Sequence, residues 1–419
     1  MSSSKNNIGK NISALYASQI ASYVFPFITI PYLARILGPE FLGLIGFCKA
    51  ITLILMNLAD YGFILTATRN ISITRYDKPA RNQIYYSTQS AKLFLSIVCL
   101  FIFLIITAMT PILRRHLLLS WIVFISVPAS SLTPVWFFLG MESMHVISLI
   151  EIFSSIISTL LIFIFIHHAA QYNLAAFFQI LYWVLSAIAG NYLLHKKYNL
   201  FPKLTSFSCI RRELASGWHV FVSTIYSNIF VNINTVIVGI FCGSMIVGYY
   251  NSAEKIVRQG QSLLGPPTKA IFPHIASLAA ASHTNALHMI RKTLLLLGGI
   301  AFLISLLLFL FAHWIVLLIL GGQFRNSVIL LKILSAIPFV VVISNILGIQ
   351  TMLNFGFKEP FQRVLMCGCI FHLLLLYPAV HFWGADGVAA LLLLTETVVC
   401  LSMLSYLYHK DVRVFGRFQ

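Results

Sequence analysis

The sequence predicts an all-α polytopic membrane protein with about twelve transmembrane helices in two lobes of six. Of its 419 residues, 59% are hydrophobic and only 9% are charged, and the mean hydropathy is +0.89. A soluble domain carries about 25% charged residues, so this class is excluded. The apolar residues form runs of about 20, the length of a membrane-spanning helix, and do not alternate as in a transmembrane β-barrel.

Glycine, proline and clustered charges divide the apolar runs into expected spans. In chain order these are residues 11–36, 41–63, 85–109, 117–139, 146–168, 174–195, 217–241, 245–271, 293–318, 328–354, 360–382 and 386–408. The ninth and tenth spans are the least regular, and a bent helix or a re-entrant segment is the alternative there. We expect helix kinks or breaks at Pro26, Pro31, Pro128, Pro134 and Gly265-Pro266-Pro267. The longest loops are expected at 64–84 and 196–216.

The distribution of Lys and Arg predicts the orientation. Eighteen of the 28 basic residues fall on the side that holds both termini, and four fall on the other side. By the positive-inside rule, both termini are expected in the cytoplasm. Because most of these charges sit at segment ends, the net charge of +17 does not indicate a nucleic-acid partner. Residues 1–10 are polar and the apolar run that follows is too long for a cleavable signal peptide.

A basic cytoplasmic linker at residues 196–216 divides the chain into an N-terminal lobe, 1–195, and a C-terminal lobe, 217–419. The lobes resemble each other locally. A shift of 205 residues places Gly38 on Gly243 and Gly43 on Gly248. The stretch 37–43 and the stretch 242–248 are each expected to join one span to the next by a tight turn. Two six-span lobes enter the membrane from the same side, which is the arrangement of a parallel repeat in transporters that rock one half against the other.

Polar and charged residues within the spans predict a hydrated, net-positive central cavity, because ionisable groups in a bilayer tend to face water or a partner. In the eighth span, four polar residues follow the spacing of one helix face, from Asn251 to Ser262. The candidates for substrate binding are Lys49, Lys92, Thr224, Asn228, Asn232, Asn251, Lys255 and Arg258, and the candidate ion-coupling acids are Asp60, Glu151, Glu254 and Glu396. Cations and amides of this kind suit an anionic cargo with hydroxyl groups.

The alternative interpretation is that these charges form interhelical ion pairs or reach the membrane interface. Glu254 and Lys255 point apart, which disfavours a pair between them. The sequence contains no catalytic motif and no long outer loop that could hold a catalytic site, so no enzyme is expected. No cysteine and histidine group has the spacing of a metal site, and no metal or cofactor is expected.

Several sequence blocks resemble a known family. The longest runs from Pro31 to Gly43 (PYLARILGPEFLG), and it is followed by ADYGF at 59–63 and TATR at 66–69. GYYNSAEK at 248–255, LKIL at 331–334 and GADGVAA at 384–390 follow in the same order. They are similar to the signature of Wzx-type O-antigen and polysaccharide flippases, which belong to the polysaccharide transport family of the MOP exporter superfamily.

The resemblance implies a MATE/MOP-like, V-shaped transporter in a bacterial inner membrane. Its cargo would be an undecaprenyl-diphosphate-linked oligosaccharide, such as an O-antigen repeat unit of lipopolysaccharide biosynthesis, moved from the cytoplasmic to the periplasmic leaflet by alternating access. The partners it implies are membrane lipid and the polymerase and chain-length proteins of the same pathway. We expect a monomer. Two alternatives stay open: a membrane glycan polymerase or ligase of this pathway, and a small-molecule or drug exporter of the same superfamily.

Overall fold

The protein is helical throughout the part of the chain that a computed structural model describes. It describes the backbone of residues 2–201, 203–412 and 414, and side chains from residue 24 onward except at 202, 219, 223–231, 413 and 415–419. This part contains no strand, which confirms the predicted all-α fold. The chain forms two compact units, Met1–Val236 and Ile237–Gln419, and the helix α10 runs through the boundary between them.

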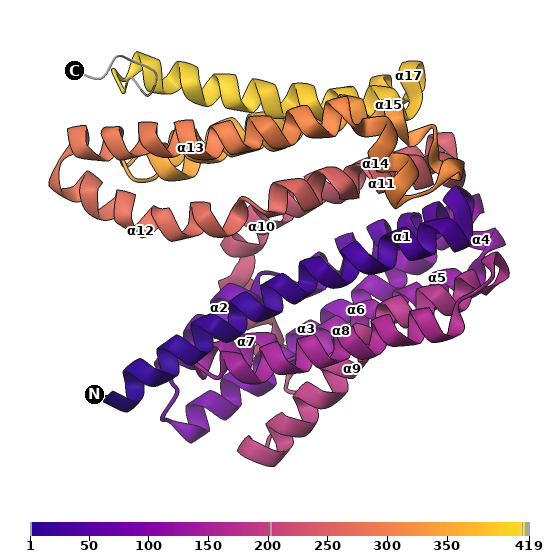
Figure 1. Cartoon of the computed structure of the whole chain (residues 1–419). Helices are drawn as coiled ribbons and strands as arrows, with labels where there is room; N and C mark the ends of the chain where they lie inside the picture. Colours follow the sequence, from indigo (N-terminus) through magenta and orange to yellow (C-terminus); the bar gives the residue numbers. More distant parts are fainter. Residues whose placement is uncertain (1, 202, 413, 415–419) are drawn as a thin grey trace. The chain divides into compact units, whose positions relative to one another are not determined.

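The first unit contains the helices drawn from indigo to magenta in Figure 1. They are α1 (Ser2–Asp60), α2 (Phe63–Ile73), α3 (Lys78–Met109), α4 (Pro111–Arg115), α5 (Leu117–Phe124), α6 (Ser126–Leu132), α7 (Val135–Gly140), α8 (Met144–Phe165), the short 3₁₀ turn η1 (Ala169–Gln171), α9 (Tyr172–Tyr198) and most of α10 (Phe207–Cys242).

The second unit contains the end of α10 and the helices drawn from pink to yellow in Figure 1. They are α11 (Ser244–Ser262), α12 (Gly265–Ala281), α13 (His283–Leu310), α14 (Ala312–Ile319), the 3₁₀ turn η2 (Gly322–Phe324), α15 (Ser327–Leu334), α16 (Ile337–Asn345), the π-helix η3 (Ile346–Met352) and α17 (Lys358–His409).

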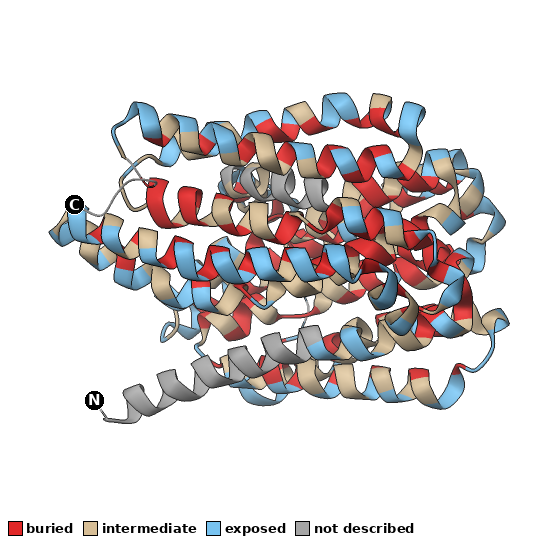
Figure 2. Cartoon of the chain, turned by 45° about the horizontal axis from the view of Figure 1, so that its top comes forward, coloured by how far each residue is buried: buried red, intermediate tan, exposed pale blue. Residues whose placement is uncertain are grey.

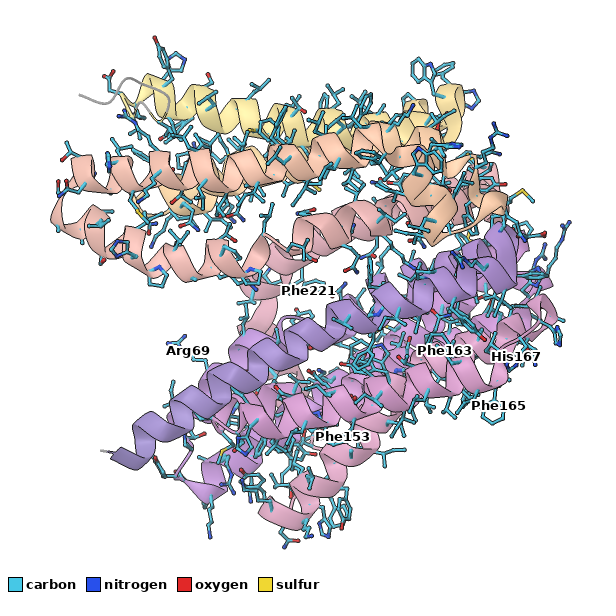
Figure 3. The ribbon with its side chains drawn as sticks, viewed as in Figure 1. Arg69, Phe153, Phe163, Phe165, His167 and Phe221 are labelled. Atoms are coloured by element: carbon cyan, nitrogen blue, oxygen red, sulfur yellow. The ribbon has the colours of Figure 1, made fainter. Side chains whose placement is uncertain are left out.

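Each of the twelve expected spans falls on helical backbone. Among the described residues, eight helical stretches are long and apolar enough to cross a membrane. Two of them, Val24–Ile73 and Lys358–His409, contain 50 and 52 residues, more than twice the length of one span. Large exposed side chains such as Phe153 and Phe165 on α8 form apolar surface of the kind that faces lipid (Figure 3). The chain is therefore a multi-pass membrane protein.

Glycines with positive φ interrupt the two long stretches. Gly384 lies inside α17 at φ 58° and ψ −140°. The chain reverses there, because the Phe357 and Tyr406 rings, at the two ends of the helix, lie 5.5 Å apart. Gly38 interrupts α1 at φ 70° and ψ 177°, and Gly243 has almost the same conformation at φ 87° and ψ 171°. The predicted tight turns at these two glycines are confirmed.

The expected loop at residues 64–84 is wrong. The helix α2 occupies Phe63–Ile73, α3 begins at Lys78, and only four residues join them. The helix α2 buries Phe63, Ala67 and Ile71, which lie one turn apart, and exposes polar residues between them. It is an amphipathic helix. Its polar residues lower the hydropathy of the segment, and for this reason a loop was predicted here.

Several of the expected spans are built from more than one helix. The fourth expected span consists of α5, α6 and α7, with breaks at Ile125 and at Thr133-Pro134. The tenth consists of α15, α16 and η3, so it is bent rather than one regular helix. The eighth changes from α11 to α12 just before the two prolines at 266 and 267, where a break was predicted.

Each unit has its own apolar core. Figure 2 colours the buried residues of the chain red. In the first unit, Tyr85, Trp136, Phe137 and Phe138 are fully buried. In the second, α13, α16, η3 and both arms of α17 enclose a core that includes Ile290, Ile346 and Met403.

Glycines allow neighbouring segments to approach closely in the first unit. A Cβ at Gly140 would lie 2.6 Å from Ile71, and one at Gly190 would lie 2.8 Å from Pro134.

Candidate functional site

The helix α11 carries the densest group of candidate residues. It begins after the Gly243 turn and buries one face through Val247, Tyr250 and Val257. The predicted polar face, Asn251, Lys255, Arg258 and Ser262, is half-buried along its whole length. This helix therefore carries a half-buried polar face in the second unit.

Arg258 forms an ion pair that the sequence interpretation did not consider. Its Nε and Nη2 donate to Oε1 of Glu254 at 2.9 and 2.5 Å. Glu254 is buried and lies one helical turn before Arg258. The sequence analysis considered an ion pair of Glu254 with its neighbour Lys255 alone. The i, i+4 spacing from Glu254 to Arg258 is the one that brings two side chains together on a helix.

Lys255 is half-buried and makes no hydrogen bond or ion pair with any side chain that the structure describes. Glu254, the neighbouring acid, attracts it without contacting it. A buried ammonium group is costly unless it is paired or hydrated. Lys255 is thus a half-buried cation with no hydrogen-bonded or ion-paired partner among the described side chains.

Glu396 on α17 completes the charged group of the second unit. It is half-buried and is close enough to attract Arg258 electrostatically. The candidate residues of this unit are thus two acids and two cations on α11 and α17. Their formal charges cancel, so the four residues together carry no net formal charge.

In the first unit, the candidate charges lie on α1, α3 and α8. Lys49 Nζ donates to Oε1 of Gln179 on α9 at 2.6 Å. Lys92 is buried and forms an ion pair with Asp60 at 2.9 Å. Glu151 is half-buried on α8, close enough to act electrostatically on Tyr182 of α9.

The seventh-span candidates lie on α10. Asn232 is half-buried and has an interaction partner. The side chains of Thr224 and Asn228 lie outside the described residues. The structure thus brings Glu254, Lys255, Arg258 and Glu396 together in one unit and Asp60 with Lys92 in the other. Among described side chains, no group of three or more His, Cys, Asp or Glu residues is placed to hold a metal ion.

Sequence reasoning missed the polar partners Gln179 and Tyr182, and it missed a row of buried polar residues on α3. Arg81, Tyr85, Thr88, Gln89, Lys92 and Ser96 are at most 7% exposed. Their spacing, near i, i+4, i+7, i+11 and i+15, is the signal that could have found them.

One further ion pair lies outside the spans. Arg75, after α2, hydrogen bonds Glu142, before α8. This hydrogen bond lowers the pKa of the Glu142 carboxyl below its ordinary value of 4.5, and it raises the pKa of Arg75. The pair joins the connection between α2 and α3 to the connection between α7 and α8.

Comparisons with known proteins agree with this fold. The profile of the family described as "Polysaccharide biosynthesis protein" matches residues 8–279. The chain is 32% identical over 416 residues to a protein of Escherichia coli (strain K12) named "Putative O-antigen transporter", covering 99% of this chain and 100% of that one. A protein of Shigella dysenteriae with the same name is 27% identical and covers 94% of this chain.

Solved structures show the same architecture. An inward-facing multidrug resistance MATE family transporter of the MOP superfamily matches with a TM-score of 0.74 at 14% identity, covering 96% of this chain and 98% of that one. An outward-facing transporter of this kind matches with a TM-score of 0.51. The resemblance drawn from the sequence is confirmed, and the chain belongs to the polysaccharide biosynthesis protein family and has the fold of the MOP-superfamily transporters.

Proposed function

We propose that the chain is a flippase that moves an undecaprenyl-diphosphate-linked oligosaccharide, such as an O-antigen repeat unit, across a bacterial inner membrane. Two relatives that align along nearly their whole length with this chain bear the name of an O-antigen transporter. The transport runs from the cytoplasmic to the periplasmic leaflet by alternating access, with both termini in the cytoplasm. The lobes at 1–195 and 217–419, joined by the linker 196–216, are the parts that move.

The observation that carries the proposal is that Lys255 on the helix α11 is half-buried and that its ammonium group has no hydrogen-bonding or ion-pairing partner among the described side chains. A diphosphate supplies the oxygens with which such a cation forms short, charge-assisted hydrogen bonds. Arg258, one turn further along the same face, is oriented by Glu254 and contributes a second set of donors. The sugar hydroxyls would meet the amide of Asn251 on this face.

This arrangement favours an anionic cargo over the cations of a drug exporter. The acid Glu254 is buried and already bonded to Arg258, so it is not presented to a cargo. Lys92 and Asp60 likewise satisfy each other in the first unit. Lys255 on α11 and Glu396 on α17 are left without a bonded partner among the described side chains. The proposal of an anionic cargo therefore rests on the α11 face, where Lys255 and Arg258 lie one turn apart.

The test is complementation of a strain that lacks its O-antigen flippase but retains the glycan-polymerising enzymes. We expect this gene to restore surface glycan and to clear lipid-linked units from the inner leaflet. Lys255→Ala should fail to restore it, whereas Lys269→Ala, a change at an exposed lysine of the same unit, should restore it. Units that reach the periplasmic leaflet without this protein but stay unpolymerised would identify a polymerase or ligase instead and would overturn the proposal.

A further inference from the structure

Arg81 is a buried cation near the start of α3. It is only 7% exposed, and it lies in the first turns of the helix, which begins at Lys78. Its Nη2 donates to Oδ1 of Asn82 at 3.3 Å, and its Nε has no hydrogen-bonding partner among the described residues. A buried guanidinium group without a counter-charge is strongly unfavourable. Arg81 therefore needs an explanation other than packing.

No acidic side chain in the described part of the chain forms an ion pair with Arg81. Asp77, one turn before it, is exposed and caps the backbone at the start of α3. Glu142, before α8, is bonded to Arg75. Glu213 of α10 accepts a hydrogen bond from a serine of α3 at 2.8 Å. These three acids thus have other partners, and the charge of Arg81 is left uncompensated.

The position of Arg81 along α3 adds to the cost of its charge. The N-terminal turns of a helix carry a partial positive charge, which repels cations and attracts anions. Basic residues are favourable at the C-terminus of a helix instead, and Lys197 has such a place in the last turn of α9. The helix dipoles therefore account for Lys197 but not for Arg81.

Arg81 and Lys197 converge on one aromatic ring. Arg81 Cζ lies 5.3 Å from the centroid of the Tyr198 ring, and Lys197 Nζ lies 5.4 Å from the same centroid. Attraction to a ring is weak beside the cost of burying an unpaired charge. Since the two cations also repel each other, a negatively charged ligand close to both of them is favoured.

Two further buried donors lie beside Arg81. The hydroxyl of Tyr85, one turn further along the same face of α3, and Nε1 of Trp136 on α7 are fully buried and have no hydrogen-bonding partner among the described residues. The rings of Tyr85 and Trp136 are stacked with centroids 6.0 Å apart. Phe137 contacts the rings of Tyr85 and Tyr198 at 5.7 and 5.2 Å. One aromatic cluster thus joins Arg81 to both donors.

The charges and donors of this cluster define the chemistry of a ligand. A water molecule can accept hydrogen bonds from them, but it leaves the positive charge uncompensated. An anion with several oxygens compensates the charge and accepts from more than one donor. A phosphate group has this chemistry, and the planar guanidinium group matches its geometry. The ligand indicated is therefore a phosphate group.

Arg81 lies just outside the apolar part of α3. The span predicted at 85–109 begins four residues later, which corresponds to about 6 Å along the helix axis. With both termini in the cytoplasm, as proposed above, this end of α3 lies at the cytoplasmic leaflet. Lys78, Lys196 and Lys197 are exposed there. Basic pockets between transmembrane helices on this side of a membrane bind the head groups of anionic lipids.

We propose that Arg81 and Lys197, together with the hydroxyl of Tyr85, bind a phosphate group at the start of α3. The phosphate of an anionic phospholipid and free inorganic phosphate present the same oxygens, and the experiment below distinguishes these two sources. The site lies in the first unit and contains none of the α11 residues proposed to bind the cargo. It therefore goes beyond the proposed transport function.

The experiment measures thermal unfolding of the delipidated full-length protein in a non-ionic detergent. Phosphatidylglycerol, inorganic phosphate, or phosphatidylethanolamine, which has no net charge, is added in separate titrations. A ligand that binds only the folded state raises the melting temperature, and we expect a saturable rise. A rise with phosphatidylglycerol but not with inorganic phosphate supports the site and identifies a lipid as its ligand. A rise with inorganic phosphate supports the site with free phosphate as a sufficient ligand. No rise, or an equal rise with phosphatidylethanolamine, would overturn the proposal.

The residues are tested with the double variant Arg81→Gln/Lys197→Gln. We expect it to bind the phosphate ligand more weakly by about tenfold for each cation removed, since each loses a charge-assisted hydrogen bond. The matched control is Lys196→Gln/Lys358→Gln, which removes the same charge from two exposed lysines and should bind as the wild type does. Equal binding by the two double variants would overturn the proposal.

Two single variants keep the test decisive if loss of the buried Arg81 impairs folding. Lys197→Gln, at an exposed position, should still weaken binding by about tenfold. Tyr85→Phe removes a hydroxyl that has no partner among the described residues, so the protein without ligand should be at least as stable as the wild type. Its ligand-dependent rise should be smaller. Lower stability without ligand and an unchanged rise would show a structural hydroxyl and overturn its assignment to the site.

These measurements need no glycan cargo, so they separate this inference from the proposed function. If the gene restores surface glycan but no phosphate ligand binds at Arg81, the transport function stands and the phosphate site is overturned. If the ligand binds but the gene restores no glycan, the phosphate site stands and the proposed cargo is wrong.

Discussion

Arg258 donates two hydrogen bonds to a single carboxylate oxygen of Glu254, one helical turn before it. The guanidinium group has five N–H donors, and the remaining three make no hydrogen bond with any described side chain. The pair therefore fixes the guanidinium plane while leaving donors for a ligand. Glu254 acts as a positioning residue for Arg258.

The first prediction concerns this positioning. Glu254→Gln should lower glycan export by about tenfold, because it removes a charge-assisted hydrogen bond that orients Arg258. Glu254→Asp should restore part of the export, since it keeps the charge. The matched control is Glu359→Gln, which breaks the exposed i, i+4 pair with Arg363. Surface glycan per inserted protein is the measurement, and equal export by both Gln variants would contradict the prediction.

The second prediction concerns the charge on the α11 face. The double variant Lys255→Ala/Arg258→Ala should abolish glycan export while the protein remains folded and inserted, because the anionic cargo loses both cations. Lys255→Arg and Arg258→Lys should be milder, because each keeps its charge. Export measured beside membrane insertion checks this. Full export by the double alanine variant would show that the two cations are structural.

The third prediction concerns pH and stability. Because Arg75 lowers the pKa of Glu142, the pair adds stability that is fully present above pH 4.5, the ordinary value, and is lost as the pH falls through the lowered value. Glu142 is 57% exposed, so the contribution is less than about 1 kcal/mol. Glu142→Gln should lower the melting temperature slightly at neutral pH and not at strongly acidic pH. An equal loss at both pH values would rule out the ion pair as the cause.

The fourth prediction concerns the turn in α17. Gly384 has a backbone conformation that other residues rarely adopt, although a Cβ there would meet only Cys242 Sγ at 3.8 Å. Gly384→Ala should therefore destabilise the protein by about 1–3 kcal/mol through backbone strain rather than a clash. Gly299→Ala, inside α13 and with open space around it, should be neutral or stabilising by about 0.4–1 kcal/mol. Thermal unfolding in detergent compares the two, and the reverse order would refute the strain argument.

The positions of the helices were predictable from the sequence because membrane insertion depends on apolar length, a local property. The turns at Gly38 and Gly243 were predictable for a similar reason, since a glycine between two long apolar runs marks a reversal. The helix α2 was not predicted, because its residues Thr66, Thr68, Arg69 and Asn70 lower its hydropathy. Its helical character depends on the buried stripe at Phe63, Ala67 and Ile71.

The charge pairs divide into two kinds. The Glu254–Arg258 pair is local, and helical spacing alone predicts it. The Asp60–Lys92 pair joins residues 32 positions apart on different helices, and the Lys49–Gln179 hydrogen bond spans 130 positions. Such contacts depend on how helices pack, which one sequence does not specify. The sequence therefore identified the candidate charges but not which of them neutralise one another.

The π-helix η3 has a consequence for comparing sequences within this family. Leu353 N–H donates to the carbonyl of Gly348, five residues earlier, instead of four as in an α-helix. Such a turn holds one extra residue, and it arises when a single residue is inserted into an existing helix. A relative whose helix is regular here would match this chain only with a one-residue gap within 346–352, placed inside a helix rather than in a loop. An ungapped alignment would shift the residues that follow by one position, which corresponds to about 100° around a helix.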